Sequence, residues 1–404
     1  MKRRDFLRLA GGVALMPGVT AWVSAEQAAG QAVFVMVFLR GGADGLHLVA
    51  PSSDPLYVAA RPADLRVLDA GEKAGLLLSN TLEPDLGFRL HPGLAPLLPL
   101  YQAGNLAIVH AAGLANATRS HFVAQDMMER GVASEKEIAE AKGWLARALP
   151  VSRDGVTAFS STSNPVFGLK GVPGYLAAPD LSGWLGFPYG DGTRQLLAQW
   201  AVSGTAIGDA TAAALQVVER VSRSLPKSAD GKVLPYTTRG SMPYSDGGDF
   251  GKRLSTVAQL VRADIGLKAA WVDYGIWDTH ENQGGRMADL ATRLAAGLAA
   301  FHEDMTQAKR PVVVVALSEF GRRLRANKSN GTDHGHGGVS FVLGAGVRGG
   351  RMYGRWPGLE TRQLDEGVDL AVTTDYRAIL AGALPLAGLP SSFPGWSGAP
   401  LPLG

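Results

Sequence analysis

The amino-acid sequence predicts an α/β protein with a largely parallel central sheet and helices on both of its faces. Uninterrupted apolar runs rich in β-branched residues, such as residues 32–39 and 312–317, are typical of strands buried on both faces. Apolar residues that recur every three or four positions from Met287 to Met305 are typical of a helix that covers such a sheet. Glycine-rich turns carrying carboxylates or imidazoles follow several strands, at the position where open α/β sheets bind ligands.

Composition limits both the class of protein and the kind of ligand. The 404 residues suffice for one large domain or two smaller ones, and 46% apolar with 19% charged residues favour a folded chain. Cysteine is absent, so the chain forms no disulfide and offers no thiolate to a metal. Any metal must therefore be bound by His, Asp, Glu or hydroxyl side chains.

The first 25 residues have the features of an export signal. Arg3-Arg4, followed by an apolar stretch that is too short and too interrupted to span a bilayer, resembles the twin-arginine translocation motif. Small residues before Glu26 suit a signal peptidase, so we expect a signal peptide over residues 1–25 and a periplasmic or secreted protein. The alternative is an N-terminal membrane anchor that is never cleaved.

The charge of the chain is concentrated in this segment. Lys2, Arg3, Arg4 and Arg8 less Asp5 account for the whole formal charge of +3, so the mature chain is close to neutral. The sequence pI of about 9.0 therefore gives no support for a nucleic-acid partner, which would require a basic patch. We expect contact with the membrane only during export.

The first two strands of the mature chain lead to candidate site residues. Asp44 lies in the glycine-rich turn after residues 32–39, where a carboxylate can approach a hard cation; alternatively it closes the turn through its own backbone. Ser120 follows the strand over residues 106–109 at the start of a helix, where the macrodipole favours a nucleophilic hydroxyl. The alternative is an ordinary N-cap with His121 as a packing or surface residue.

Three further groups of candidates lie in the second half of the chain. Asp278 and His280 follow the strand over residues 268–274 and are two residues apart, so both can face one cation if the turn is extended. Glu319 and Arg322 follow the strand over residues 312–317. Imidazoles and glycines then precede a strand over residues 339–343; the imidazoles are His334 and His336.

The other segments are assigned structural roles. A single domain is predicted over residues 26–404, with a loop-rich insertion at residues 131–252. Part of this insertion is rich in Ser, Thr, Gly and Pro. His91 is expected to begin a short helix, His302 to be a solvated helix residue, and Thr374 or Asp375 to cap a helix. Further helices are predicted over residues 123–130, 210–225 and 254–265.

Because the turns at one edge of a parallel sheet lie close together, we expect the candidate side chains to converge around a cation. The set also carries a resemblance to a known family. Five motifs in fixed order resemble a large exported bacterial family of unknown function that is grouped with the alkaline-phosphatase-like and sulfatase-like superfamily. These motifs are Leu39-Arg40-Gly41-Gly42 with Asp44, Arg119-Ser120-His121-Phe122, Trp277-Asp278-Thr279-His280, Ser318-Glu319-Phe320-Gly321-Arg322 and Gly331-Thr332-Asp333-His334-Gly335.

The resemblance implies an alkaline-phosphatase-like fold and a site in which Asp44, Asp278 and His280 bind metal. It implies that Ser120 is the nucleophile and that His336 or His334 is the last metal ligand. The superfamily has an Asp-His pair where this chain has Ser318-Glu319, so Glu319 is expected to serve as an oxygen ligand. This departure leaves one or two divalent cations as the expected number.

The implied activity is metal-dependent hydrolysis of a small phosphate or sulfate ester through a covalent intermediate on Ser120. Arg119 or Arg322 is expected to clamp the anionic group. Mixed nitrogen and oxygen ligands favour Zn or Mn over Mg or Ca. The alternative function is a non-catalytic exported binding or assembly protein that retains the hydrolase fold.

Overall fold

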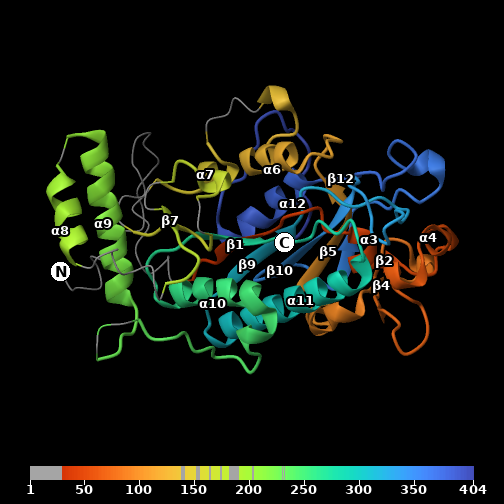
Figure 1. Cartoon of the computed structure of the whole chain (residues 1–404), viewed down its shortest axis with the longest axis horizontal. Coiled ribbons are helices and arrows are strands. Elements are labelled where there is room, and N and C mark those ends of the chain that lie inside the picture. The colour runs from red at the N-terminus through yellow and green to blue at the C-terminus, as the bar shows by residue number, and fades with distance from the viewer. Residues whose placement is uncertain are drawn as a thin grey trace, which may run out of the picture. The chain divides into compact units, whose positions relative to one another are not determined.

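A sheet with helices on both faces is the central feature of the fold (Figure 1). The computed structural model describes residues 30–137, 142–151, 155–162, 165–172, 175–181, 191–202, 204–229, 231 and 233–404. The expected signal peptide, residues 1–25, lies outside the described residues. The unit described below is formed by residues 32–404.

In the described part of the chain this sheet has nine strands, in the order β11-β5-β10-β9-β1-β8-β6-β7, with β12 also paired to β5. Its strands are β1 (Val33–Leu39), β5 (Leu106–Gly113), β6 (Ala158–Ser160), β7 (Tyr175–Ala177), β8 (Ala269–Tyr274), β9 (Val312–Leu317), β10 (Gly338–Gly344), β11 (Arg351–Tyr353) and β12 (Thr374–Asp375). Only β10 runs antiparallel to its neighbours β5 and β9. A smaller antiparallel sheet contains β2 (Val49–Pro51), β3 (Leu76–Leu77) and β4 (Phe88–Leu90).

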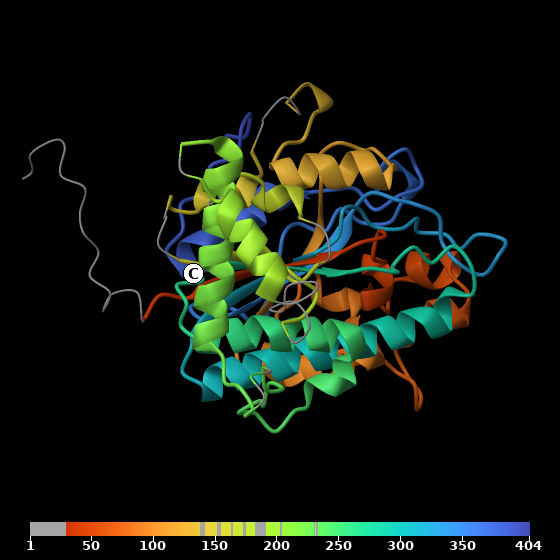
Figure 2. The same cartoon turned by 60° about the vertical axis from the view of Figure 1, so that its left-hand side comes forward.

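Two hydrophobic cores lie on the two faces of the large sheet. Along β1, Val35 and its alternate neighbours face one core, whereas Met36 and its alternate neighbours face the other. This is why the strand reads as an uninterrupted apolar run. Helices α10 (Gly248–Arg262) and α11 (Gln283–Gln307) cover the first face, and α6 (His121–Arg130), α7 (Trp144–Ala148) and α12 (Tyr376–Ala383) cover the second. Figure 2 shows α6 on the opposite side of the sheet from α10 and α11.

The remaining described helices are short or lie within the region predicted to be loop-rich. The α-helices are α3 (Gly45–Leu48), α4 (Pro55–Ala60), α5 (Leu98–Gln102), α8 (Asp191–Trp200) and α9 (Ala206–Ser224). The 3₁₀ helices are η1 (Ala63–Leu65), η2 (Pro84–Leu86), η3 (Pro92–Leu97), η4 (Glu135–Glu137), η5 (Phe167–Leu169), η6 (Tyr244–Gly247), η7 (Thr361–Gln363) and η8 (Leu384–Ala387).

The predicted α/β architecture with a largely parallel sheet is confirmed, with two differences. Strand β10 is antiparallel because residues 318–337 contain no crossover helix, and a parallel return needs one. Strands β6 and β7 extend the sheet from within the segment predicted to be loops. Each has three residues, too few to show a strand periodicity in the sequence.

The predicted helix starts are confirmed at two positions. The Asp375 carboxylate accepts a hydrogen bond from the backbone N–H of Arg377 at the start of α12. The Nδ1 atom of His91 accepts one from the backbone N–H of Gly93 at the start of η3. Helix α10 begins earlier than expected, at Gly248; its first turn contains Gly248 and Gly251, which have low helix propensity, so the sequence carries no helix signal there.

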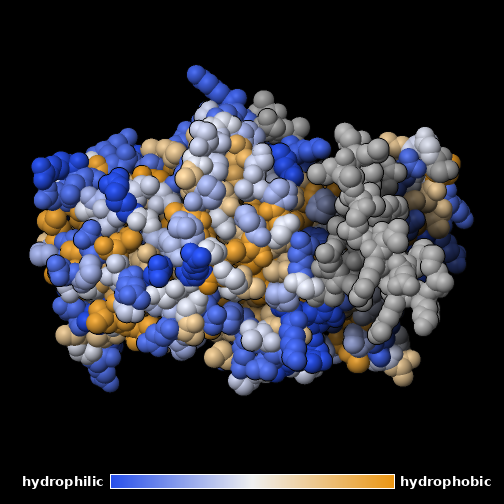
Figure 3. Space-filling model, turned by 180° about the vertical axis from the view of Figure 1, so that it is seen from behind, coloured by the Kyte–Doolittle hydropathy of each residue, from blue (hydrophilic) through white to orange (hydrophobic). Residues whose placement is uncertain are grey.

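The surface is of mixed character. Seen from behind, hydrophilic and apolar side chains are interspersed over the molecule (Figure 3). Among the described residues, no helix has the length and apolar content needed to cross a bilayer.

Acid should destabilise the fold through three buried histidines. Burial lowers the pKa of His47 to about 3 and those of His91 and His110 to about 4, from an ordinary 6.5. As the pH falls below 6.5 the unfolded chain binds protons that the folded chain does not, so stability is lost down to those lower values. Each histidine should remove up to roughly 2 kcal/mol between pH 6.5 and about 5.

Urea unfolding at pH 7 and at pH 5, in the presence of a chelator, measures this loss. Glu319 raises the pKa of His121, so the folded chain binds a proton on this one ring more readily than the unfolded chain does. This offsets part of the loss of stability. Carboxylates titrate mostly below this window. Equal unfolding free energies at the two pH values would contradict the assignment of neutral buried rings.

Candidate metal centre

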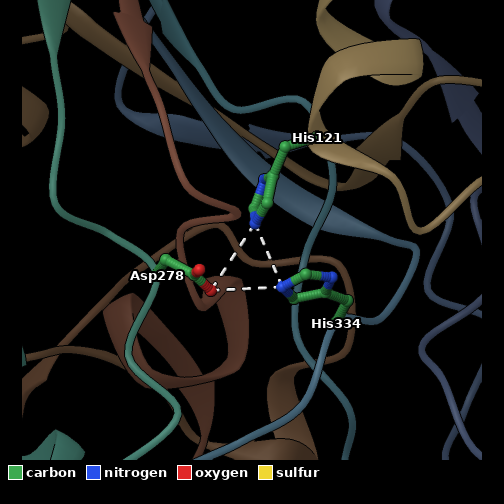
Figure 4. Close-up of side chains that lie close together, drawn as sticks. All are labelled: His121, Asp278 and His334. Atoms are coloured by element: carbon green, nitrogen blue, oxygen red, sulfur yellow. Dashed lines mark hydrogen bonds and ion pairs between the residues drawn. The ribbon is translucent and has the colours of Figure 1, made fainter.

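Loops from distant parts of the chain meet at the edge of the sheet where the parallel strands end. His121 begins α6 beyond the end of β5, Asp278 follows β8, and His334 precedes the antiparallel β10. Their side chains point toward one another (Figure 4). The expected convergence of strand-terminal turns is therefore observed for these three residues.

The polar atoms of this group have spacings that suit a metal ion. The Nε2 atoms of His121 and His334 are 3.0 Å apart, and Asp278 Oδ1 lies 3.1 Å from His334 Nε2 and 3.5 Å from His121 Nε2. One ligand atom from each residue lies within 4.8 Å of the others. Ligands about 2.0–2.1 Å from a tetrahedral zinc are roughly 3.3–3.4 Å apart, so small shifts would admit the ion.

His280 lies beside the group and extends it. Its Nε2 atom is 2.9 Å from His334 Nε2 and 2.9 Å from Asp278 Oδ1. Its Nδ1 atom faces the Asp333 carboxylate at 3.4 Å. The structure thus brings together three predicted metal ligands, Asp278, His280 and His334.

The tautomers of the rings explain why a cation fits here. The Nδ1 atom of His121 faces a carboxylate oxygen of Glu319 at 2.8 Å, and Nδ1 of His334 faces the backbone oxygen of Arg119 at 2.8 Å. An acceptor behind Nδ1 is typical of histidines that bind a metal through Nε2, and it favours the Nδ1–H tautomer of His121 and His334. In that tautomer both Nε2 lone pairs face the Asp278 carboxylate, and a cation between them would remove the repulsion.

Glu319 supports His121 from behind. Its Oε1 atom accepts hydrogen bonds of 2.8 Å from His121 Nδ1, Gln125 Nε2 and the backbone N–H of Gly41. Burial alone raises the pKa of Glu319, but the hydrogen bonds from His121 and Gln125 outweigh it and lower the pKa, so the side chain is a carboxylate. A carboxylate behind an imidazole is the usual second partner of a metal-binding histidine. Glu319, predicted to bind the metal, thus has this position instead.

Replacing Glu319 with glutamine should weaken metal binding by roughly 10–100-fold, the usual cost of altering such a partner. The amide keeps the size of the side chain, but it orients and polarises the His121 ring less well. Titration of the metal-free protein with Zn²⁺ measures the change. Glu303→Gln, on the surface of α11, is the matched control and should leave the affinity unchanged.

Arg322 orders the loops around the group. Its buried guanidinium donates to the backbone oxygens of Gly42, Thr332 and Gly41, and to Asp278 Oδ1 at 2.5 Å. Burial raises the pKa of Asp278, but the Arg322 guanidinium outweighs this and lowers it to about 2. Asp278 is therefore ionised, and Arg322, predicted to clamp an anion, is bonded to the protein through all three nitrogens.

The glycine-rich turn after β1 approaches the loop that carries Asp278 closely. A Cβ atom on Gly41, which has φ +118°, would lie 2.6 Å from the backbone nitrogen of Asp278. Glycine at this position therefore allows the turn to pack against the Asp278 loop.

Two predicted metal ligands lie outside the group. Asp44 is fully buried, and its carboxylate accepts hydrogen bonds of 2.7 and 3.1 Å from Arg61 and of 2.7 Å from Gln283. His336 faces an Asp365 carboxylate oxygen at 3.0 Å with Nδ1 and the Leu114 backbone oxygen at 2.9 Å with Nε2. Other parts of the protein thus already bond the polar atoms of both side chains.

The predicted catalytic residues Arg119 and Ser120 precede His121 directly. The Arg119 guanidinium is paired with Asp369 and, at 3.0 Å, with Glu366, so carboxylates of the protein already neutralise its charge. Ser120 is exposed at the N-cap of α6, and its hydroxyl makes no capping hydrogen bond. It is one residue from a candidate ligand and available to solvent.

His121 is the site residue to which sequence reasoning gave no ligand role. Its only sequence signal is its position at the start of a helix after a buried strand, within the motif that contains Ser120. Helical geometry directs the ring over the preceding turn and toward Glu319, a contact 198 residues away in the chain. Sequence spacing alone gives no measure of such a contact.

Comparison with known proteins gives one family match. Residues 203–384 match a family described as a protein of unknown function, DUF1501. The match includes Asp278, His280, Glu319 and His334. It begins at residue 203 and therefore does not include His121. No curated protein matches the chain.

Two solved structures show a distant similarity. The PH0037 protein from Pyrococcus horikoshii has 10% identity and a TM-score of 0.29, and the match covers 79% of this chain and 87% of that one. The lipoteichoic acid synthase LtaP from Listeria monocytogenes has 10% identity and a TM-score of 0.28, with 88% and 78% covered. At TM-scores this low, neither similarity bears on fold or function.

Proposed function

We propose that the protein is a metal-dependent hydrolase of phosphate or sulfate esters. One observation carries this proposal: the Nε2 atoms of His121 and His334 and an oxygen of Asp278 lie 3.0, 3.1 and 3.5 Å from one another. His280 lies beside them as a further ligand. Three imidazoles with one carboxylate favour Zn or Mn over Mg or Ca.

When bound, the metal would polarise the ester and favour nucleophilic attack on it. The metal itself would attract an anionic substrate. Asp278, Glu319 and Asp333 carry one negative charge each, Arg322 carries one positive charge, and imidazoles are neutral when they bind a metal. A divalent cation would thus offset the excess negative charge of the group and bind an anionic oxygen of the substrate.

Ser120 is the proposed nucleophile. Its exposed hydroxyl lies at the N-terminus of the ten-residue helix α6, where the macrodipole favours an alkoxide and an adjacent anion. The Ser120 oxygen would bond to phosphorus or sulfur as the ester oxygen leaves, and its proton would pass to solvent. Water would then release the bound group.

The alkaline-phosphatase-like character of the fold and export through the twin-arginine pathway belong to the same proposal. The order of the five sequence motifs supports the first, and the Arg3-Arg4 pair supports the second. Fractionation of the producing cell tests export directly, since recovery of the whole protein in the cytoplasm would contradict it.

The second candidate is a non-catalytic binding or assembly protein that uses the metal structurally. It is favoured by the two arginines predicted to clamp a substrate, because Arg119 is paired with Asp369 and Arg322 is buried against the protein. Assays of the zinc- and manganese-loaded protein on aryl phosphates, phosphodiesters and aryl sulfates separate the candidates. Metal binding without turnover of any substrate would favour this second function.

Ser120→Ala should lower turnover by roughly 10³-fold or more while the metal content stays unchanged. The substitution removes the nucleophilic oxygen but no metal ligand. Elemental analysis and kinetics on the same preparation give both readouts. Ser255→Ala, on α10, is the control and should retain turnover; equal activity of Ser120→Ala and the native protein would exclude Ser120 as nucleophile.

A further inference from the structure

A pocket of about 270 Å³ lies at the end of β8. The residues of this strand end are close in sequence to Asp278 of the candidate metal centre. The lining of the pocket includes Tyr274 and Ile276, and Asp278 follows Ile276 by two residues. Helices α10 and α11 supply the other walls, including Phe250, Arg253 and Arg293. The loop after β8 therefore carries both Asp278 of the candidate metal centre and part of the wall of this pocket.

Ile276 is unusual in two independent respects. Its φ is +67°, a left-handed conformation that is a genuine outlier for a β-branched residue. Its side chain is also 72% exposed, although it is large and apolar. Glycine would adopt this backbone without strain, and a polar residue would suit the exposure. Strained residues cluster at ligand sites, where the conformation has a role in binding.

The pocket is suited to an aromatic group. Phe250 and Tyr274 form one wall as a stacked pair, with ring centroids 4.6 Å apart and an interplanar angle of 17°. Their rings are almost completely buried, which makes this wall rigid. A cavity of about 150 Å³ holds a benzene molecule, so 270 Å³ accommodates a substituted ring.

The charged residues that line the pocket are largely paired within the protein. Arg293 is paired with Asp289 at 2.9 Å, and Arg253 donates to the backbone oxygen of Asp273 at 2.8 Å. Because these groups are paired, an apolar ring can lie beside them at little cost, and their remaining N–H groups can donate to a polar substituent of the ligand.

We propose that this pocket binds the aryl or similarly sized apolar leaving group of the ester substrate, with the exposed Ile276 side chain as the contact that selects it. The inference rests on the proposed ester hydrolase. It adds a class of substrate, aryl esters in preference to small alkyl esters, and a residue that determines specificity.

Binding of two non-hydrolysable phosphonates to the zinc-loaded full chain tests this. Phenylphosphonate should bind at least about tenfold more tightly than methylphosphonate, the gain expected from burying one ring. In Ile276→Gly the ratio should fall to within about threefold. The metal content should stay unchanged, and Tm should be equal or higher because glycine relieves the strained φ.

Two controls separate contact from strain. Ile276→Ala retains a Cβ atom at positive φ but loses the apolar contact, so it should lose the aryl preference without the gain in Tm. Ile207→Ala removes an isoleucine that is 76% exposed on α9, and it should keep the native ratio. An unchanged ratio in Ile276→Gly, or no aryl preference in the native protein, would overturn the proposal.

The pocket is also testable without ester chemistry. The chain has six isoleucines, so isotope-labelled isoleucine methyl groups give a simple NMR spectrum in which Ile276→Gly identifies one signal. Benzyl alcohol should shift that signal and leave the Ile207 signal in place. A shift without binding of either phosphonate would contradict the ester function and support the pocket. Phosphonate binding without a shift would support the ester function and contradict the pocket. The absence of both responses would contradict both proposals.

Discussion

Replacing His334 with alanine should abolish high-affinity metal binding. The His334 Nε2 atom lies at the centre of the group, 3.0 Å from His121 Nε2, 2.9 Å from His280 Nε2 and 3.1 Å from Asp278 Oδ1. Removing it leaves the other donors without their shared neighbour. The loss of affinity should exceed the roughly 10–100-fold expected for Glu319→Gln, which changes only a supporting partner.

The matched control is His336→Ala, because this second imidazole is only two residues away. Its ring nitrogens face Asp365 and Leu114 and not the group, so its removal should leave Zn²⁺ affinity within about threefold of native. Calorimetric titration and elemental analysis measure both variants. Full metal content in His334→Ala, or loss of metal only in His336→Ala, would show that the cation site is elsewhere.

Replacing Arg61 with methionine should have the largest effect on stability. Arg61 and Asp44 form an ion pair of 2.7 Å in which neither side chain has any exposed surface. Truncation leaves the Asp44 carboxylate buried without its counter-charge, which typically costs about 3–5 kcal/mol. Arg61 also donates to the backbone oxygens of Leu324 and Arg323, so the loop before the metal centre should loosen as well.

Urea unfolding of the metal-free protein measures this loss. The double variant Asp44→Leu with Arg61→Met replaces both charges with apolar groups and should recover the part of the loss that comes from the unpaired carboxylate, but not the hydrogen bonds to Leu324, Arg323 and Gln283. A cost below about 1 kcal/mol for Arg61→Met would show that the pair is solvated. Asp44→Asn is a separate test of the predicted ligand role: it should reduce stability and retain the metal if Asp44 is structural, and lose the metal if Asp44 is a ligand.

The strands that position the site are predictable from sequence because their environment is uniform. Residues of β1 and β9 are buried on both faces, so each strand reads as one apolar run whatever its neighbours are. No comparable sequence pattern predicts the antiparallel direction of β10 or the addition of β6 and β7 to the sheet. Both depend on how the connecting segments return to the sheet.

The sequence by itself determined that carboxylates and imidazoles occur where buried strands end, and hence that Asp278, His280 and His334 are candidates for one site. Only the tertiary structure decided which candidates face one another. It pairs Asp44 with Arg61, turns His336 toward Asp365 and brings His121 into the group in front of Glu319. The physical reason is that a buried polar side chain bonds to the nearest complementary group in space, and these partners come from segments whose distance in sequence carries no information about contact.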